Sequence, residues 1–300
     1  MSLTPLTVMY GKLEGAAGKF SRDPSGYLSI EAGIFRQKGL EVSWVHVQGT
    51  EERYRRLESG AADISLVVGR ASLVHFLDSR TTRLIGSSMN SCPYYLMVEP
   101  KIGKVGDLKG KSVACREGTA SVSPLAQVFR EQGGLELGED IVVKMPEGDQ
   151  DAFNLLINGE VQAALLPRQF GFVAEERGFK RMSGWPEVVD DPLPVTMETT
   201  EKTLREGKKN FATFLEAHRE GIRYLKTHRA ETIRMLGSNF GLSRDIAVKT
   251  FDDYLIWLDD RLTIDMEQLG KLLAYLAPNF PGGVRKLAAE WIVPGALRAS

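Results

Sequence analysis

Short predicted strands and helices alternate between residues 29 and 69, and this alternation limits the folds that the chain can adopt. Glycines at the ends of the two predicted helices can take the left-handed conformation that closes a helix. The segments are a helix to Gln37, a strand Leu40–Val47, a helix Arg53–Ser59 and a strand Ile64–Val68. Such alternation is typical of a parallel sheet covered by helices on both faces, which binds ligands beyond the carboxyl ends of its strands.

The rest of the chain continues this alternation and then becomes helical. Further strands are predicted at Leu6–Tyr10, Arg83–Met89, Tyr94–Val98, Ser112–Cys115, Ile141–Met145, Val161–Leu166 and Val195–Thr199. Further helices are predicted at Ser25–Gln37, Ala71–Leu77, Ser121–Gln132, Asp149–Asn158, Gln169–Arg177, Lys202–Thr227, Ala230–Phe240, Arg244–Leu258 and Met266–Leu276. Two successive strands near residue 90 indicate a crossing to a second lobe, and the strand at 195–199 indicates the return. We expect the helical tail to pack on the first lobe.

Length and charge exclude several classes of protein. A chain of 300 residues corresponds to about two domains and can bury a large core without disulfides or metals. The net charge of −1 argues against a nucleic-acid-binding surface. No apolar run approaches the roughly 18 residues of a membrane span. The two cysteines, Cys92 and Cys115, are interpreted as half-buried free thiols.

Three phrases carry a resemblance to a known family. The first combines Glu31–Phe35, Gly39–Val42 and Leu57–Ile64; the second is Val105–Val113; the third is Leu156–Ala164. In this order they resemble the sulfonate-, taurine- and thiamine-precursor-binding proteins of ABC transporters, a thiamine-precursor-synthase-like family. The resemblance covers roughly the first two-thirds of the chain. The fungal thiamine-precursor synthases carry a cysteine-rich motif that two cysteines cannot supply.

The resemblance implies the α/β fold of type II periplasmic binding proteins. In that fold each of two lobes is a mostly parallel sheet flanked by helices, and the ligand lies in a cleft between the lobes. We expect lobe I to comprise residues 1–99 and 196–300, and lobe II residues 100–195. The family also implies a periplasmic location. The amino terminus carries no signal peptide, so we expect that one was removed; a native chain without a leader would be cytoplasmic.

Four arginines follow predicted strand ends or lie in the first loop: Arg22, Arg70, Arg116 and Arg168. Each alone could be a solvated charge or a structural ion pair. Together they predict a cleft that holds an anion, because the planar guanidinium binds a carboxylate or sulfonate through two parallel hydrogen bonds.

Helix starts supply the remaining candidate ligand contacts. The segment from Gly118 to Ser123 follows a strand and opens a helix, where free N–H groups and the helix dipole favour anions; the alternative is a plain helix cap. The candidates in and beside these helix starts and strand ends are Ser25, Tyr27, Thr50, Gly69, Asn90, Thr119 and Ser121. The expected ligands include aromatic acids, because three tyrosines lie near these positions: Tyr27, Tyr94 and Tyr95. A structural role for Tyr27 is an equally open alternative.

Catalytic and metal sites find little support in the sequence. His46, His75, His218 and His228 show no spacing to a serine or cysteine and an acid that predicts a nucleophilic set. The acids Glu147, Asp149 and Asp151 are interpreted as a helix amino terminus and not as a metal site. We expect no cofactor and no metal.

The expected function is therefore the solute-binding component of an ABC importer, without enzymatic activity. It would bind a small carboxylate or sulfonate by hinge closure and dock, as a monomer, on a membrane permease. Two alternatives remain open: an enzyme on the same fold, such as a small-acid decarboxylase or a dehydratase, and a sensor without a transporter.

Overall fold

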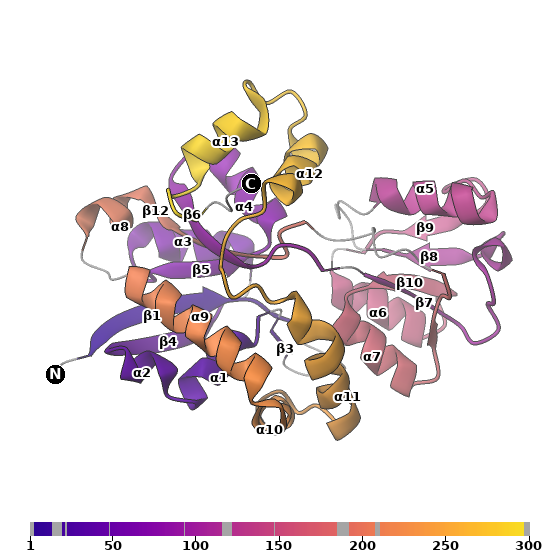
Figure 1. The fold of residues 1–300 in the computed structure, drawn as a ribbon. Coiled ribbons are helices and arrows are strands. Elements are labelled where there is room, and N and C mark those ends of the chain that lie inside the picture. Colours follow the sequence, from indigo (N-terminus) through magenta and orange to yellow (C-terminus); the bar gives the residue numbers. More distant parts are fainter. Residues whose placement is uncertain are drawn as a thin grey trace. The chain divides into compact units, whose positions relative to one another are not determined.

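The computed structural model describes residues 3–13, 20–21, 23–47, 49–92, 94–115, 122–146, 148–184, 192–207 and 211–296. The chain divides into two compact units (Figure 1). Unit 1 comprises Met1–Lys12, Phe20–Ser91 and Pro192–Ser300, and unit 2 comprises Leu13–Lys19 and Cys92–Asp191. Each unit is built on its own five-stranded sheet.

The sheet of unit 1 is mostly parallel. Its strands, in spatial order, are β4 (Leu40–His46), β1 (Thr4–Tyr10), β5 (Ile64–Val67), β12 (Val195–Thr200) and β6 (Thr82–Met89). Strand β1 is parallel to β4 and β5, whereas β12 is antiparallel to both β5 and β6. Four strands therefore point one way, and only the returning strand β12 opposes them. A short ribbon of β2 (Lys12–Leu13) and β3 (Phe20–Ser21) follows β1.

The helices of unit 1 pack on this sheet or on one another. They are α1 (Ser25–Glu31), α2 (Ile34–Gln37), α3 (Thr50–Ser59), α4 (Gly69–Ser79), α8 (Glu201–Glu206), α9 (Phe211–Thr227), α10 (Arg229–Phe240), α11 (Arg244–Lys249), α12 (Met266–Leu276) and α13 (Gly283–Trp291). The chain moves from β1 to β4 and then back past β1 to β5, so right-handed connections put α1 and α2 on one face and α3 on the other.

The helices differ from the predicted ones in several places. The helix expected from 25 to 37 is broken at Gly33, whose φ of 74° does not continue a right-handed helix. The helix expected to reach Leu258 instead changes to a π-helical turn, Thr250–Tyr254, and a 3-10 turn, Leu255–Trp257. Helix α13 was not predicted, yet its Trp291 is fully buried and stacks on Phe76 of α4.

The core of unit 1 fixes α1 between the sheet and α9. Phe35 of α2 stacks on Phe214 of α9 with ring centroids 5.6 Å apart. Gly26 permits the closest approach, because a Cβ there would lie 2.0 Å from the indole ring of Trp44 on β4. The helical tail thus packs within unit 1, as expected.

Unit 2 repeats the plan with a smaller sheet. Its strands, in spatial order, are β11 (Lys180–Arg181), β7 (Tyr95–Val98), β10 (Ala163–Leu166), β8 (Ser112–Ala114) and β9 (Val142–Lys144). Only β7 runs against the others. Its helices are the 3-10 helix η1 (Val105–Leu108), α5 (Val122–Gly133), α6 (Asp149–Ile157) and α7 (Arg168–Glu176). Leu96, Val113, Phe129 and Leu165 contribute to one buried apolar cluster.

Two further observations concern the described residues as a whole. None of their helices combines the length and apolar character that crossing a membrane requires. Cys92 and Cys115 form no disulfide within the described part of the chain, as expected, but both are buried and not half-buried. Burial raises the pKa of Cys115 to about 11, which keeps this thiol protonated.

Candidate functional site

Most predicted site residues of unit 1 lie at the carboxyl edge of its sheet. Four strands end there, and the returning strand β12 begins there. Gly69, the first residue of α4, donates its N–H to the Leu193 carbonyl at 2.8 Å, and the Leu193 N–H donates to the Asn90 carbonyl at 2.9 Å. These backbone bonds join the ends of β5 and β6 to the start of β12.

Arg53 of α3 brings a guanidinium to this edge. Its Nη1 donates to the Leu66 carbonyl of β5 at 3.0 Å, and its Nη2 lies 3.4 Å from the acceptor Thr50 Oγ1. Gly11, which follows β1, lies against the same group, since a Cβ at this position would come within 3.1 Å of Nη1. The guanidinium therefore sits between the ends of β1 and β5 and the start of α3.

The charge of Arg53 has no paired carboxylate among the described residues. Arginine has five N–H donors, and only two bonds to protein oxygens are seen in this part of the chain. Burial lowers the pKa of Arg53, although arginine still remains charged in proteins. A partly buried guanidinium with unused donors is suited to bind an anion through charge-assisted hydrogen bonds.

A buried acid, Glu198 of β12, lies near this group. Ser72 of α4 donates its hydroxyl to Glu198 Oε2 at 2.6 Å; Tyr54 and Thr82 lie near the same carboxyl, but their hydroxyls form no hydrogen bond with it among the described residues. Glu198 is fully buried. Burial raises its pKa to about 7, although these hydroxyls and Arg53 act in the opposite direction.

Asp23, Ser25 and His218 form a second buried cluster in unit 1. His218 Nε2 lies 3.1 Å from both Asp23 Oδ2 and Ser25 Oγ, and Ser25 donates its hydroxyl to Asp23 Oδ1. Burial acts to raise the pKa of Asp23, but attraction to His218 and hydrogen bonds with His218 and Ser25 together lower it below 3.8.

This cluster has the residue types of a hydrolase triad without its geometry. In a triad the acid and the serine contact opposite ring nitrogens of the histidine. Here both contact Nε2, while Nδ1 is buried without a hydrogen-bond partner among the described residues, and all three side chains are buried. The cluster instead fastens the start of α1 to α9. Sequence spacing missed it because Ser25 and His218 are 193 positions apart.

The structure gives other predicted residues of unit 1 distinct environments. Ser25 uses both its hydroxyl and its backbone N–H within the protein. Tyr27 is 38% exposed and packs against Tyr10 and Phe240. Thr50 begins α3 and contacts Arg53, whereas Arg70 is exposed in the first turn of α4.

Asn90 holds a loop and also lines a cavity of about 400 Å³. Its amide donates to the Thr263 carbonyl at 2.8 Å, and its oxygen accepts from the Asp265 N–H at 2.9 Å. Asp259 and Arg261 also line this cavity, but they form an ion pair with each other at 2.8 Å. The Asn90 side chain therefore holds the loop at residues 263–265 in place. The charges of Asp259 and Arg261 beside it compensate each other.

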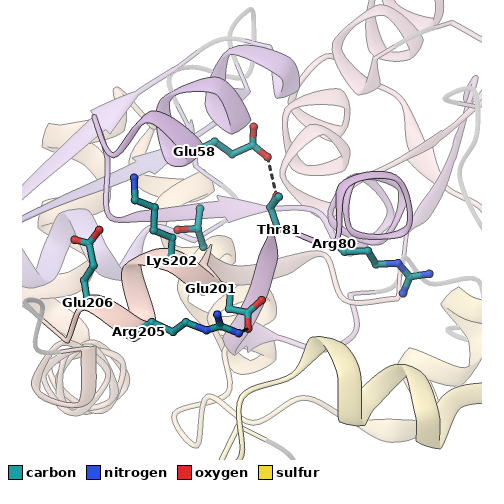
Figure 2. Close-up of a pocket in the computed structure, with 8 residues that line it drawn as sticks. Glu58, Arg80, Thr81, Glu201, Lys202, Arg205 and Glu206 are labelled. Atoms are coloured by element: carbon teal, nitrogen blue, oxygen red, sulfur yellow. Dashed lines mark hydrogen bonds and ion pairs between the residues drawn. The ribbon is translucent and has the colours of Figure 1, made fainter.

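A larger cavity, of about 660 Å³, lies at the opposite edge of the same sheet (Figure 2). Its charged lining residues are Glu58, Arg80, Glu201, Lys202, Arg205 and Glu206. Arg80 pairs with Glu290 at 3.1 Å, and Glu201 pairs with Arg83 at 2.8 Å and with Arg205. Because β12 ends here and β6 begins here, this cavity is not at the edge where ligands are expected.

In unit 2, Arg168 and Tyr95 lie at the carboxyl edge of the sheet. Arg168 opens α7 after β10, is 5% exposed and donates to the Tyr95 hydroxyl at 3.0 Å. Tyr94 and Tyr95 are both buried. Asp149 opens α6, as expected for a helix amino terminus. Arg22, Arg116, Thr119 and Ser121 lie outside the described residues.

Sequence reasoning missed Arg53, whose half-buried guanidinium lies at the carboxyl edge of the unit 1 sheet. The sequence places it only within a predicted helix, whereas three of the four predicted arginines follow strand ends. The available signal is its position three residues after Thr50, one helical turn from the start of α3. No group of three His, Cys, Asp or Glu side chains within the described ranges could hold a metal ion.

Comparisons with known proteins agree with this fold. The periplasmic aliphatic sulphonate-binding protein SsuA of Escherichia coli has a TM-score of 0.68 and 16% identity over 100% of this chain and 95% of that chain. The alkanesulfonate-binding protein SsuA of Xanthomonas axonopodis pv. citri, bound to MOPS, has a TM-score of 0.65 and 15% identity, with 100% of each chain covered.

A third similar structure is a DSZB mutant in complex with biphenyl-2-sulfinic acid. It has a TM-score of 0.65 and 13% identity over 96% of this chain and 93% of that chain. At such identities these matches confirm the expected periplasmic-binding-protein fold and nothing more. A search of curated proteins gave no match.

Family assignment rests on a separate comparison. The family model described as NMT1/THI5 like matches residues 25–232, which is more than half of the chain. The matched segment contains the first phrase of the sequence from Glu31 onward and both later phrases. The chain belongs to the NMT1/THI5-like family.

Proposed function

We propose that the protein is the solute-binding component of an ABC importer and binds a small organic anion. The family, the sulfonate-binding proteins among its structural relatives and the cationic sheet edge of unit 1 support this proposal. The ligand, a carboxylate or sulfonate, would lie in a cleft between two lobes that close by hinge motion. The proposed lobes are residues 1–99 with 196–300, and residues 100–195.

The Arg53 guanidinium is the observation that carries this proposal. It offers unused donors at the edge where ligands of parallel sheets bind, beside the Thr50 hydroxyl. A micromolar Kd corresponds to about 8 kcal/mol, which a few charge-assisted hydrogen bonds in a dry site can supply. Arg168 is proposed to contribute from unit 2, where it occupies the equivalent edge.

A thermal-shift screen of the purified protein tests the proposal. The probes are ethanesulfonate, benzoate, nitrate, an aliphatic carboxylate and a pyrimidine. A probe at 100 times its Kd should stabilise the fold by about 2.7 kcal/mol and raise the melting temperature. Stabilisation by an organic anion, with the probe recovered at unchanged mass, supports the proposal. Stabilisation by the pyrimidine alone, or by no probe, contradicts it.

An enzyme on the same fold is the second candidate function. The structural likeness to DSZB, solved with a sulfinic acid, favours it. The Asp23, Ser25 and His218 cluster gives it no support, because it is buried and lacks triad geometry. Mass spectrometry of each stabilising probe distinguishes the two functions, since a changed mass after incubation identifies turnover.

The proposed partner is a membrane permease, and the proposed location is the periplasm. We further propose that the protein is a monomer. Size-exclusion chromatography with light scattering tests the monomer, and reconstitution with any permease that a neighbouring gene encodes tests the partnership. Neighbouring genes without a permease and an ATPase would favour a sensor.

A further inference from the structure

The buried residue Glu198 lies on β12, which pairs with β5, the strand whose Leu66 carbonyl accepts a hydrogen bond from Arg53. Leu66, whose carbonyl accepts a hydrogen bond from Arg53, pairs across the sheet with Met197, the residue before Glu198. Arg53 and Tyr54 are consecutive in α3, and Tyr54 lies near the Glu198 carboxyl. A proton on Glu198 is therefore positioned to influence the charge at the candidate anion site.

We propose that Glu198 sets the positive charge that Arg53 offers to a ligand, so that anion binding is coupled to protonation of Glu198. This inference rests on the proposed function, because it assigns a regulator to the same site. Neutral Glu198 leaves the Arg53 charge uncompensated. Ionised Glu198 attracts Arg53 and repels the bound anion, which weakens binding.

The groups that face Glu198 determine which side chain can change its charge near neutral pH. They are Arg53 and Tyr54 from α3, Ser72 from α4, Thr82 from β6 and, as the cross-strand partner, Ser65 from β5. Serine and threonine do not titrate in the accessible pH range, and tyrosine and arginine titrate far above neutrality. Glu198 is thus the group in this cluster whose charge changes near neutral pH.

His75 is the nearby alternative and needs its own control. Its ring stacks on Tyr54 with centroids 3.5 Å apart, and its Nε2 lies 3.1 Å from Glu58 Oε1. Because His75 is an ionisable side chain in contact with Tyr54, a variant at this position serves as the control. His75 is partly exposed and paired to Glu58, whereas Glu198 is sealed inside the sheet and α4 interface.

The burial of Glu198 predicts the direction of the effect. Since burial raises its pKa to about 7, the group is mostly neutral at about pH 6 and mostly ionised at about pH 8.5. Binding should be at least about fivefold tighter at the lower pH, within the usual range of coupling between sites. By linkage, binding at about pH 7.5 should take up a proton.

Calorimetric titration with ethanesulfonate, benzoate and nitrate tests this coupling, because these probes keep one negative charge throughout the pH range. Tris and imidazole serve as buffers, since neither carries a competing anionic group. Their different heats of ionisation report the number of protons taken up. Wild-type protein should bind more weakly as the pH rises and should take up part of a proton per anion.

Two variants identify the titrating group. Glu198→Gln keeps the shape but cannot ionise, so it should bind equally at both pH values and take up no proton. His75→Gln should retain the wild-type pH dependence. Three results would overturn the inference and leave the proposed function intact. They are a pH dependence of binding that persists in Glu198→Gln, a pH dependence that is lost in His75→Gln, and binding by the wild-type protein without proton uptake. Failure of the wild-type protein to bind any of the three probes would overturn both.

Discussion

Replacement of Glu198 by glutamine should stabilise the protein at alkaline pH. Glu198 is fully buried, and its pKa is raised by burial from 4.5 to about 7. The unfolded chain therefore loses this proton at lower pH than the folded protein does. Folding stability contributed by the neutral carboxyl is complete below about pH 4.5 and is lost as the pH rises through about 7.

The size of the effect follows from the two pKa values. Each pKa unit corresponds to about 1.4 kcal/mol, so the wild-type protein loses about 3 kcal/mol by about pH 8 relative to a variant that cannot ionise. In a unit of this size, that corresponds to a difference in Tm of roughly 6–12 °C. At about pH 4.5 the two proteins should melt at similar temperatures, because glutamine can still accept the Ser72 hydrogen bond.

Thermal melts followed by circular dichroism between about pH 4.5 and 8.5 measure this difference. Glu160→Gln is the matched control, because Glu160 is exposed at the surface of unit 2. The control should follow the wild-type profile at every pH. Identical profiles for Glu198→Gln and wild type would refute the reasoning, since the buried carboxyl would then ionise as easily as an exposed one.

Three further predictions concern other buried groups and a predicted ligand contact. Asp23→Asn should destabilise the fold at neutral pH by about 3–5 kcal/mol, since it breaks a buried cluster. Because the pKa of Asp23 is lowered, the difference in urea midpoint should narrow as the pH falls through that pKa, and a constant difference would contradict this. Cys115, whose pKa burial raises to about 11, should resist Ellman's reagent at pH 8 until the protein is unfolded; rapid labelling of the native protein would contradict its burial. Arg116→Ala should weaken anion binding at least about tenfold in calorimetry, and unchanged affinity would remove Arg116 from the proposed site.

The order of strands and helices was largely predictable because local chemistry determines it. Gly39 and Gly60 both adopt positive φ, and each closes a helix just before a predicted strand or turn. The buried strands β5 and β10 are short apolar runs between turns, and their observed bounds lie within two residues of the predicted ones. These features depend on neighbouring residues alone.

Long-range placement was harder to predict, and the candidate site depends on it. Arg53 donates a hydrogen bond to the carbonyl of Leu66, which lies on β5, the strand that follows α3 in the sequence. The sequence pattern of α3 alone does not indicate this contact. Ser25 stays a predicted ligand contact, and its buried side chain contacts His218 of α9, which lies 193 positions away in the sequence. In the sequence, Glu198 is a single acid in a predicted strand that is rich in threonine. Its raised pKa results from the packing of α3 and α4 over it, which the sequence pattern does not reveal.

The central claim is that the Arg53 guanidinium holds the anion, and one pair of variants tests it most directly. Ethanesulfonate is titrated into wild type, Arg53→Gln and Arg55→Gln by calorimetry at about pH 6. Arg55 lies on the same helix but is exposed and paired with Glu52. Arg53→Gln should weaken binding at least about tenfold, because hydrogen bonds to charged groups contribute about 1.5–3 kcal/mol each, whereas Arg55→Gln should bind as wild type does. Equal affinity of wild type and Arg53→Gln would contradict the account.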